Sequence, residues 1–137
     1  MAKRQRMWVY SPPRPTKPKA PESLKAEVQA RADDLVDTVL KPKHVKPPPE
    51  DERFNYIVDL YTKWHGSSLY FCARYHSPGP NAISPYFDTR FTRMEYAGGD
   101  RFNLAYMRYT EKWQELYFGL TVDECLATIR EQPHFWP

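Results

Sequence analysis

Histidines and cysteines are the side chains of this sequence most able to bind a metal or attack a substrate. Cys72 and Cys125 lack the close spacing of a zinc site and are too few for a disulfide framework, so we expect buried free thiols. His65 and His76 stand at opposite ends of one predicted strand, about 20 Å or more apart at the usual rise per residue, and cannot share a metal ion. The pattern predicts no metal, no cofactor and no catalytic nucleophile, and therefore a protein that is not an enzyme.

A second group of polar side chains is expected on one face of the predicted sheet. Arginine beside tyrosine on such a face suits a phosphate or a carboxylate. Arg90 or Arg93 joins this face depending on the strand register. The competing interpretation is cross-strand charge pairing on a solvated surface, such as Asp59 with Arg74, which contributes about 0.2–1 kcal/mol. The candidate ligand surface consists of Asp59, Arg74, His76 and Arg108.

A basic and proline-rich arm precedes the predicted fold. Residues 1–20 contain six of the 20 Lys and Arg residues and no acid, so the arm is cationic while the rest of the chain is slightly acidic. Such an arm attracts polyanions or docks on acidic surfaces. Prolines recur at every third position from Pro12 to Pro21, the period of a polyproline II helix. The candidate partner-binding residues of the arm are Arg4, Arg6, Trp8, Tyr10, Arg14 and Lys17.

Trp8 and Tyr10 leave three interpretations of the arm open. Rings placed between cations suit phosphate contacts combined with base stacking. Two rings in alternate positions also suit a strand added to a sheet edge, in the arm's own domain or in a second copy. The proline stripe suits a protein partner. The sequence favours docking on the same domain or on a twin subunit.

Composition and hydrophobic period divide the chain into an arm and one domain over residues 22–137. Nine of the 14 prolines lie in residues 1–49, which leaves the remainder free to form an ordinary core. Apolar residues first recur at helical spacing and then, after a proline-rich and acidic stretch, at every second position. The predicted order is arm 1–21, helix 22–41, linker 42–52, β-meander 53–119 and helix 121–132.

Local signals predict where each helix begins or ends. Pro42 should end the first helix, because proline has no N–H to continue it and disfavours helical backbone before it. Thr121 and Glu124 form a capping box, in which each side chain accepts a bond from the other's backbone N–H. Pro133 then closes the second helix.

Two hairpins are predicted within the meander. Gly66 suits the first central position of a type II′ turn, which sets Trp64 opposite Leu69. A three-residue loop at 98–100 aligns Tyr96 with Phe102, whereas a two-residue loop inverts one strand, and both registers stay open. Strict alternation places the apolar face of the first strand at Phe54, Tyr56, Val58, Leu60 and Trp64.

The segment Phe91–Trp113 reads FTRMEYAGGDRFNLAYMRYTEKW. It resembles the central segment of a family of small uncharacterised bacterial proteins, and the resemblance covers at most the C-terminal half of the chain. It implies a bacterial, cytoplasmic protein and assigns no activity.

These patterns predict an α+β fold, in which an antiparallel meander of about five strands is packed by an N-terminal and a C-terminal helix and carries an extended Pro-rich arm. No segment resembles a signal peptide or a bilayer span, so we expect a cytoplasmic location and no membrane partner. The sequence favours a non-catalytic protein-interaction or self-association module that binds a protein partner or a second copy. The alternatives are a nucleic-acid-associated protein that uses the arm, and a small-ligand or enzymatic site on the polar sheet face.

Overall fold

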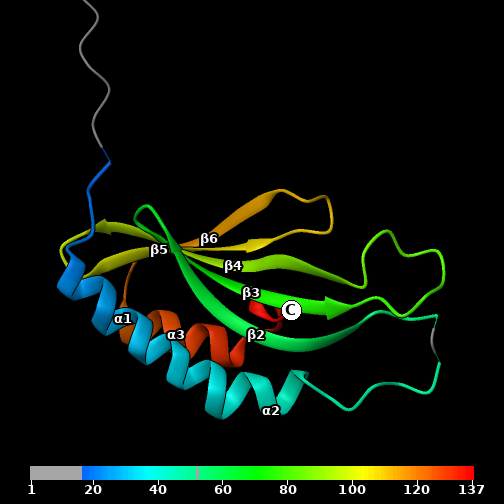
Figure 1. Cartoon of the computed structure of the whole chain (residues 1–137). Helices are drawn as coiled ribbons and strands as arrows, with labels where there is room; N and C mark the ends of the chain where they lie inside the picture. The colour runs from blue at the N-terminus through cyan, green and yellow to red at the C-terminus, as the bar shows by residue number, and fades with distance from the viewer. Residues whose placement is uncertain (1–16, 52) are drawn as a thin grey trace, which may run out of the picture.

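A computed structural model describes residues 17–51 and 53–137 of the chain. Figure 1 shows a curved sheet with two helices, α1 and α3, along one of its faces, so the predicted α+β architecture is confirmed. The elements are α1 (Glu22–Leu35), η1 (Val36–Leu40), α2 (Lys41–His44), β2 (Tyr56–His65), β3 (Ser68–His76), β4 (Tyr86–Gly98), β5 (Arg101–Met107), β6 (Trp113–Thr121), α3 (Val122–Glu131) and η2 (Pro133–Phe135).

The sheet is an antiparallel meander with the strand order β2-β3-β4-β5-β6. In the β2–β3 hairpin Trp64 faces Leu69 and Asp59 faces Arg74, as predicted. Gly66 has a φ of 61° at the first central position of the turn, where a type II′ turn requires a positive value. Turn chemistry and hydrophobic pattern therefore specify the same register.

The β4–β5 hairpin, whose register stayed open at the level of sequence, combines a two-residue tip with a bulge. Gly98 pairs with Arg101 across the tip, and the register then shifts so that Tyr96 faces Phe102. Gly98 and Gly99 have φ values of 105° and 58°, which residues with a Cβ rarely adopt. The extra residue keeps the apolar side chains of both strands on one face, in the alignment expected of the three-residue loop.

The start of β2 departs from strict alternation. The register shifts between Ile57 and Asp59, which leaves Val58 as an extra residue and exchanges the two faces before it. Ile57 therefore packs against the core, whereas Phe54 precedes the strand with 60% of its surface exposed. The predicted apolar face at Phe54, Tyr56 and Val58 was wrong, because alternation alone cannot reveal a bulge.

The N-terminal helix continues past Pro42, where the sequence predicted its end. Beyond Leu35 the chain forms a π-helical turn, in which the Lys41 N–H donates to the Val36 carbonyl, and α2 then runs to His44. A proline ring inside an α-helix crowds the carbonyl four residues earlier and lacks an N–H to bond it. The wider π turn directly before Pro42 relieves this crowding, so the helix ends three residues later than predicted.

The core lies between the helices and the sheet face turned toward them, the inner sheet face. An ion pair between Arg31 and Asp123 joins α1 to α3 on the solvent side of the helical layer. Fully or almost fully buried side chains come from both layers: Val28, Ala32, Leu35, Val36 and Leu40; Leu60, Leu69, Phe71, Met94, Phe102 and Leu104; Cys125 and Ile129.

The C-terminal segment completes this core. Phe135 is fully buried, and its carbonyl accepts a 2.9 Å hydrogen bond from the buried Thr92 hydroxyl. Trp136 Nε1 donates to the Ile129 carbonyl at 2.9 Å, and Lys43 Nζ lies 3.2 Å from the centre of the Trp136 ring. The last residues thereby fasten the sheet, α3 and α2 to one another.

Replacing Phe135 with Ala should lower the free energy of unfolding by about 3–5 kcal/mol, because it removes a fully buried ring and leaves a cavity. Equilibrium unfolding in urea measures this change. Glu131→Ala, at an exposed position in the last turn of α3, is the matched control and should stay within about 0.5 kcal/mol of the parent chain. Equal effects of the two substitutions would show that Phe135 does not hold the core together.

Candidate functional site

The outer sheet face, defined as the sheet surface turned away from the helices, carries a concentration of arginine and aromatic side chains. The antiparallel register places alternate residues of β2, β3 and β4 on this face in successive rows. The two central rows are Lys63, Tyr70 and Arg93, and Tyr61, Cys72 and Arg90.

Arginines on this face lie against rings. The guanidinium carbon of Arg90 is 4.3 Å from the centre of the Tyr70 ring, and that of Arg93 is 5.1 Å from the Trp113 ring. The Tyr70 and Trp113 rings are themselves 5.6 Å apart, although they come from β3 and β6. Cation–π contact orients a guanidinium while leaving its N–H groups free to donate to a ligand.

A bulge in β4 brings the two central arginines together. Arg90 and Arg93 are three residues apart, so an unbroken strand would place them on opposite faces. The register between β3 and β4 shifts around Phe91, with Phe71 facing Thr92 and Cys72 facing Arg90. Phe91 itself is 7% exposed and joins the core. The bulge thus turns a ring inward and both arginines outward.

Basic side chains outnumber acidic ones in this region, which leaves an excess of positive charge. Within the described part of the chain, Lys63, Arg74 and Arg90 have no acidic side chain at ion-pair distance. Two acids are ion-paired: Glu95 is 3.1 Å from Lys17 Nζ and Glu115 is 3.5 Å from Arg93 Nη2. Asp88 accepts the neutral Tyr61 hydroxyl at 2.9 Å and keeps its negative charge.

Small residues form the floor beneath these long side chains. Cys72 is 3% exposed and Ala105 is fully buried, although both belong to the outer sheet face by register. Burial raises the pKa of the Cys72 thiol, and burial followed by the hydrogen bond to Asp88 raises the pKa of Tyr61 to about 12. Both groups therefore stay protonated at neutral pH, and Cys72 is no nucleophile there.

The structure separates Asp59 from Arg74, two members of the predicted ligand surface. They are register partners, but the Asp59 carboxylate is 3.2 Å from Lys41 Nζ on α2. Hydrogen bonds to Asp37 and then to Asp59 raise the pKa of Lys41. Arg74 instead lies 5.1 Å from the centre of the Tyr86 ring.

Of the other two members of that surface, His76 shares a neighbour with Arg74, whereas Arg108 lies elsewhere. His76 Nδ1 is hydrogen-bonded to the Tyr56 hydroxyl at 2.9 Å, at the end of β3 opposite the hairpin tip. Arg108 follows β5 and lies 5.9 Å from the Tyr109 ring. Arg74 and His76 both contact the Tyr86 ring, whose centre is 5.1 Å from the Arg74 guanidinium carbon and 5.0 Å from the centre of the His76 ring. The structure thus brings together two of the four predicted residues.

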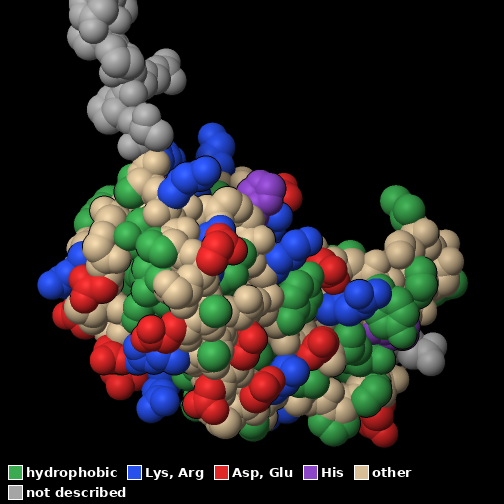
Figure 2. All heavy atoms as spheres, turned by 60° about the vertical axis from the view of Figure 1, so that its left-hand side comes forward, with side chains coloured by type: hydrophobic (Ala, Val, Ile, Leu, Met, Phe, Trp, Pro, Cys, Tyr) green, Lys and Arg blue, Asp and Glu red, His purple; other side chains and the backbone are tan. Residues whose placement is uncertain are grey.

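Most candidate residues of the arm, Arg4, Arg6, Trp8, Tyr10 and Arg14, lie outside the described residues. Lys17 is described, and residues 17–20 cross the tip of the β2–β3 hairpin. Lys17 Nζ pairs with Glu95 on β4 at 3.1 Å, and the Ala20 N–H donates to Ser67 Oγ at 2.9 Å. We name residues 17–20 the crossing segment. In Figure 2, Lys and Arg side chains and a His gather where the described chain begins.

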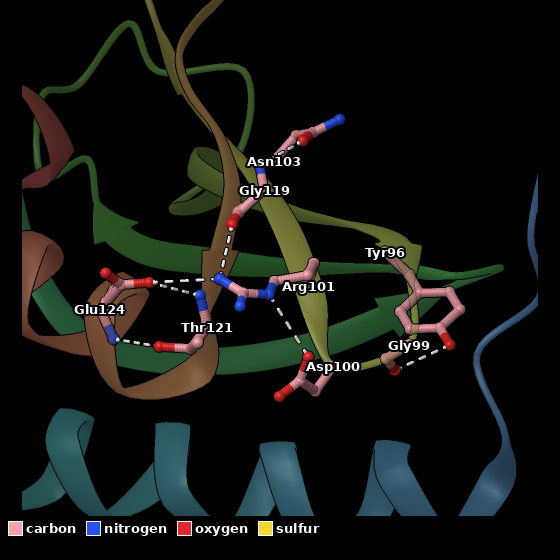
Figure 3. Close-up of polar contacts among 8 residues, drawn as sticks. All are labelled: Tyr96, Gly99, Asp100, Arg101, Asn103, Gly119, Thr121 and Glu124. Carbon is pink, nitrogen blue, oxygen red and sulfur yellow. Dashed lines mark hydrogen bonds and ion pairs between the residues drawn. The ribbon is translucent and has the colours of Figure 1, made fainter.

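A dense polar network joins the β4–β5 tip to the start of α3 (Figure 3). Arg101 Nη1 donates to the Gly119 carbonyl at 3.2 Å and lies 3.8 Å from Glu124 Oε1. The Thr121 N–H donates to Glu124 Oε1 at 2.9 Å and the Glu124 N–H donates to Thr121 Oγ1 at 3.2 Å, which confirms the predicted capping box. These groups bond one another, so we interpret the network as structural.

Two features of the described residues bear on other classes of site. In residues 17–51 and 53–137, no three His, Cys, Asp or Glu side chains come close enough to hold a metal ion. None of the helices in this part of the chain is long and apolar enough to cross a bilayer.

Residues 20–137 match the family Domain of unknown function (DUF3024), and the chain belongs to that family. The match covers every described helix and strand. No curated protein and no solved structure matches the chain. The predicted membership of an uncharacterised family is confirmed, while the bacterial origin stays a prediction.

Sequence reasoning missed Tyr70 and Trp113 as members of the site. Alternation in β3 placed Leu69 and Phe71 inward, which already implied that Tyr70 points to the other face. Nothing in the sequence indicated that Trp113, three strands away, would reach the Tyr70 ring.

Neither cysteine should react with Ellman's reagent in the folded protein at pH 8. Both side chains are buried, and burial raises the pKa of the Cys125 thiol to about 12 and also raises that of Cys72. Absorbance at 412 nm should rise only when denaturant unfolds the chain, and should then report two thiols. A thiol that reacts within seconds in the native protein would contradict the described packing.

Proposed function

We propose that this protein binds single-stranded nucleic acid through the outer sheet face and catalyses no reaction on it. The observation that carries the proposal is the pair of arginine–ring contacts, Arg90 on Tyr70 and Arg93 on Trp113, on one face of the sheet. No other surface of the described chain combines rings, fixed guanidinium groups and unpaired cations in this way.

Stacking on these groups requires bases that are not paired. Aromatic rings and guanidinium planes offer flat surfaces to any base, and such stacking contributes about 1–3 kcal/mol per base with little regard to sequence. A duplex hides the faces of its bases inside its own stack. An exposed sheet face lined with such planes therefore suits a single strand.

Phosphate contacts follow from the charge of the same face. Lys63, Arg74 and Arg90 lie on neighbouring strands of the described sheet with no acidic partner, so their N–H groups are free to bind phosphate oxygens. The arm continues this charge in sequence with Arg4, Arg6 and Arg14. A nucleic-acid strand bound here would lie along a series of positively charged side chains.

Replacing Arg90 with Ala should weaken binding of a fluorescein-labelled oligothymidylate by about tenfold, because it removes one stacking plane and one phosphate contact. The slope of log Kd against log salt concentration should fall by about 0.7, the value for one phosphate contact on a single strand. Fluorescence anisotropy between 50 and 200 mM salt gives both quantities.

Arg130→Ala is the matched control, because it removes the same charge from the exposed side of α3. It should leave both the Kd and the slope nearly unchanged. The proposal is wrong if the affinity of the parent chain does not depend on salt concentration, or if the two variants lose affinity equally.

A second candidate function, contact with a protein partner or a second copy, is favoured by the end of the sheet that projects past the helices. Exposed apolar side chains gather there from three segments: Phe54 (60% exposed), Ile83 (106%) and Phe87 (39%). Figure 2 shows hydrophobic side chains over this projecting part. We name these three residues the apolar end. Apolar patches of this kind mark interaction surfaces.

Self-association through the apolar end predicts a dimer that the double variant Phe54→Ser, Ile83→Ser converts to monomer. Sedimentation velocity at about 10–100 μM, where weak dimers populate, measures the change. Tyr109→Ser removes a ring that is even more exposed than Phe54, from the β5–β6 turn, and should leave the dimer intact. If the parent chain is monomeric at all these concentrations, self-association is excluded. The apolar end would then contact a different protein.

A further inference from the structure

A cavity of about 470 Å³ lies between the crossing segment and the tip of the β2–β3 hairpin. Tyr70 and Arg93, which share one row of the outer sheet face, form part of its lining, so it continues that face. Its walls supply ammonium, guanidinium, imidazole and hydroxyl groups, all of which bind phosphate oxygens. The groups that the cavity gathers are Lys17, Lys19, His65, Ser68, Tyr70 and Arg93.

The charge of this cavity is positive. Lys17, Lys19 and Arg93 contribute three cations, against two acids: Glu95 pairs with Lys17 and Glu115 pairs with Arg93, so one net positive charge remains. The Arg93 side chain is only 17% exposed and is fixed by contact with the Trp113 ring and with Glu115. Lys19 has no ion-pair partner among the described residues. Such a site offers several cationic donors to an anion that has several acceptor oxygens.

The crossing segment closes one end of the outer sheet face. Its two bonds, from the Ala20 N–H to Ser67 and from Lys17 to Glu95, tie it to the hairpin tip and to β4. A nucleic-acid strand that lies along the rings toward this tip meets the crossing segment. If the nucleic acid ends there, its terminal group occupies the cavity.

We infer that the cavity binds a phosphate monoester at the end of a single strand that lies on the outer sheet face. This inference rests on the proposed function and names the part of the strand that is selected. A terminal phosphate monoester carries about −1.5 to −2 charges at pH 7 and three acceptor oxygens, against one charge for an internal phosphate. The lysines, Arg93 and the Ser68 hydroxyl supply donors for those acceptors.

The test compares three oligothymidylates of one length, labelled internally, that end in hydroxyls only, in a 5′-phosphate or in a 3′-phosphate. One of the two phosphorylated strands should bind the full chain about tenfold more tightly than the hydroxyl strand, as expected for a few charge-assisted hydrogen bonds. Which strand does so identifies the end that is recognised. Fluorescence anisotropy at one fixed salt concentration measures all three dissociation constants.

The double variant Lys17→Ala, Lys19→Ala should abolish that gain in affinity. Its dissociation constant for the hydroxyl strand should stay within about threefold of the value for the parent chain. Lys46→Ala with Lys112→Ala, which removes the same charge from exposed positions elsewhere, should keep it. Three equal dissociation constants would overturn the inference and leave the proposed function standing. If the 5′-phosphate and the 3′-phosphate raise the affinity equally, added charge alone explains the effect and the inference is wrong. The inference is also wrong if the gain in affinity persists in the variant Lys17→Ala, Lys19→Ala. Binding of none of the strands would remove both proposals.

Discussion

Burial of one sheet face beneath two helices from opposite ends of the chain is the interaction on which the rest of this structure depends. Val28 and Leu40 from the first helical segment and Cys125 and Ile129 from α3 all pack on the inner sheet face, and Phe135 fills the remaining space. Hydrophobic burial of this extent is the main favourable term in folding. Because the helices use only one face, the other face of a five-stranded sheet is left to carry polar and aromatic side chains.

The same constraint explains why the candidate site is well ordered without being enclosed. Its rings and guanidinium groups stand on a floor of small residues, Cys72 and Ala105, whose backbone belongs to the rigid centre of the sheet. Arg93 is held by Trp113 from β6 as well as by its own strand. Side chains prepared in this way lose less conformational entropy when a ligand binds. The site is an open surface, which suits a long ligand better than a small one.

Local signals predicted much of the fold and little of the site. Gly66 and the alternation around it determined the β2–β3 register, and Thr121 with Glu124 determined where α3 begins. The bulges at Val58 and Phe91 escaped prediction, because each depends on contacts with a neighbouring strand rather than on the residues around it. The Phe91 bulge matters most, since it alone puts Arg90 and Arg93 on one face.

Pro42 and Trp113 show two further limits. Proline is a reliable helix breaker only where the preceding turn keeps α geometry, and here a π turn removes the conflict. Trp113 reaches Tyr70 through the shape of the whole sheet, which no local pattern encodes. The predicted ligand surface converged only in part: Asp59 pairs with Lys41 on the helical layer, whereas Arg74 and His76 both contact the Tyr86 ring.

The indole N–H signals in a ¹H–¹⁵N correlation spectrum test the central claim most directly. Trp64 Nε1 donates to the Lys25 carbonyl and Trp136 Nε1 to the Ile129 carbonyl, both on the helical side, whereas Trp113 lies with Arg93 and Tyr70 on the outer sheet face. Titration with an oligothymidylate should shift the Trp113 signal and leave those of Trp64 and Trp136 in place. Shifts at Trp64 or Trp136 with Trp113 unmoved would contradict binding on the outer sheet face.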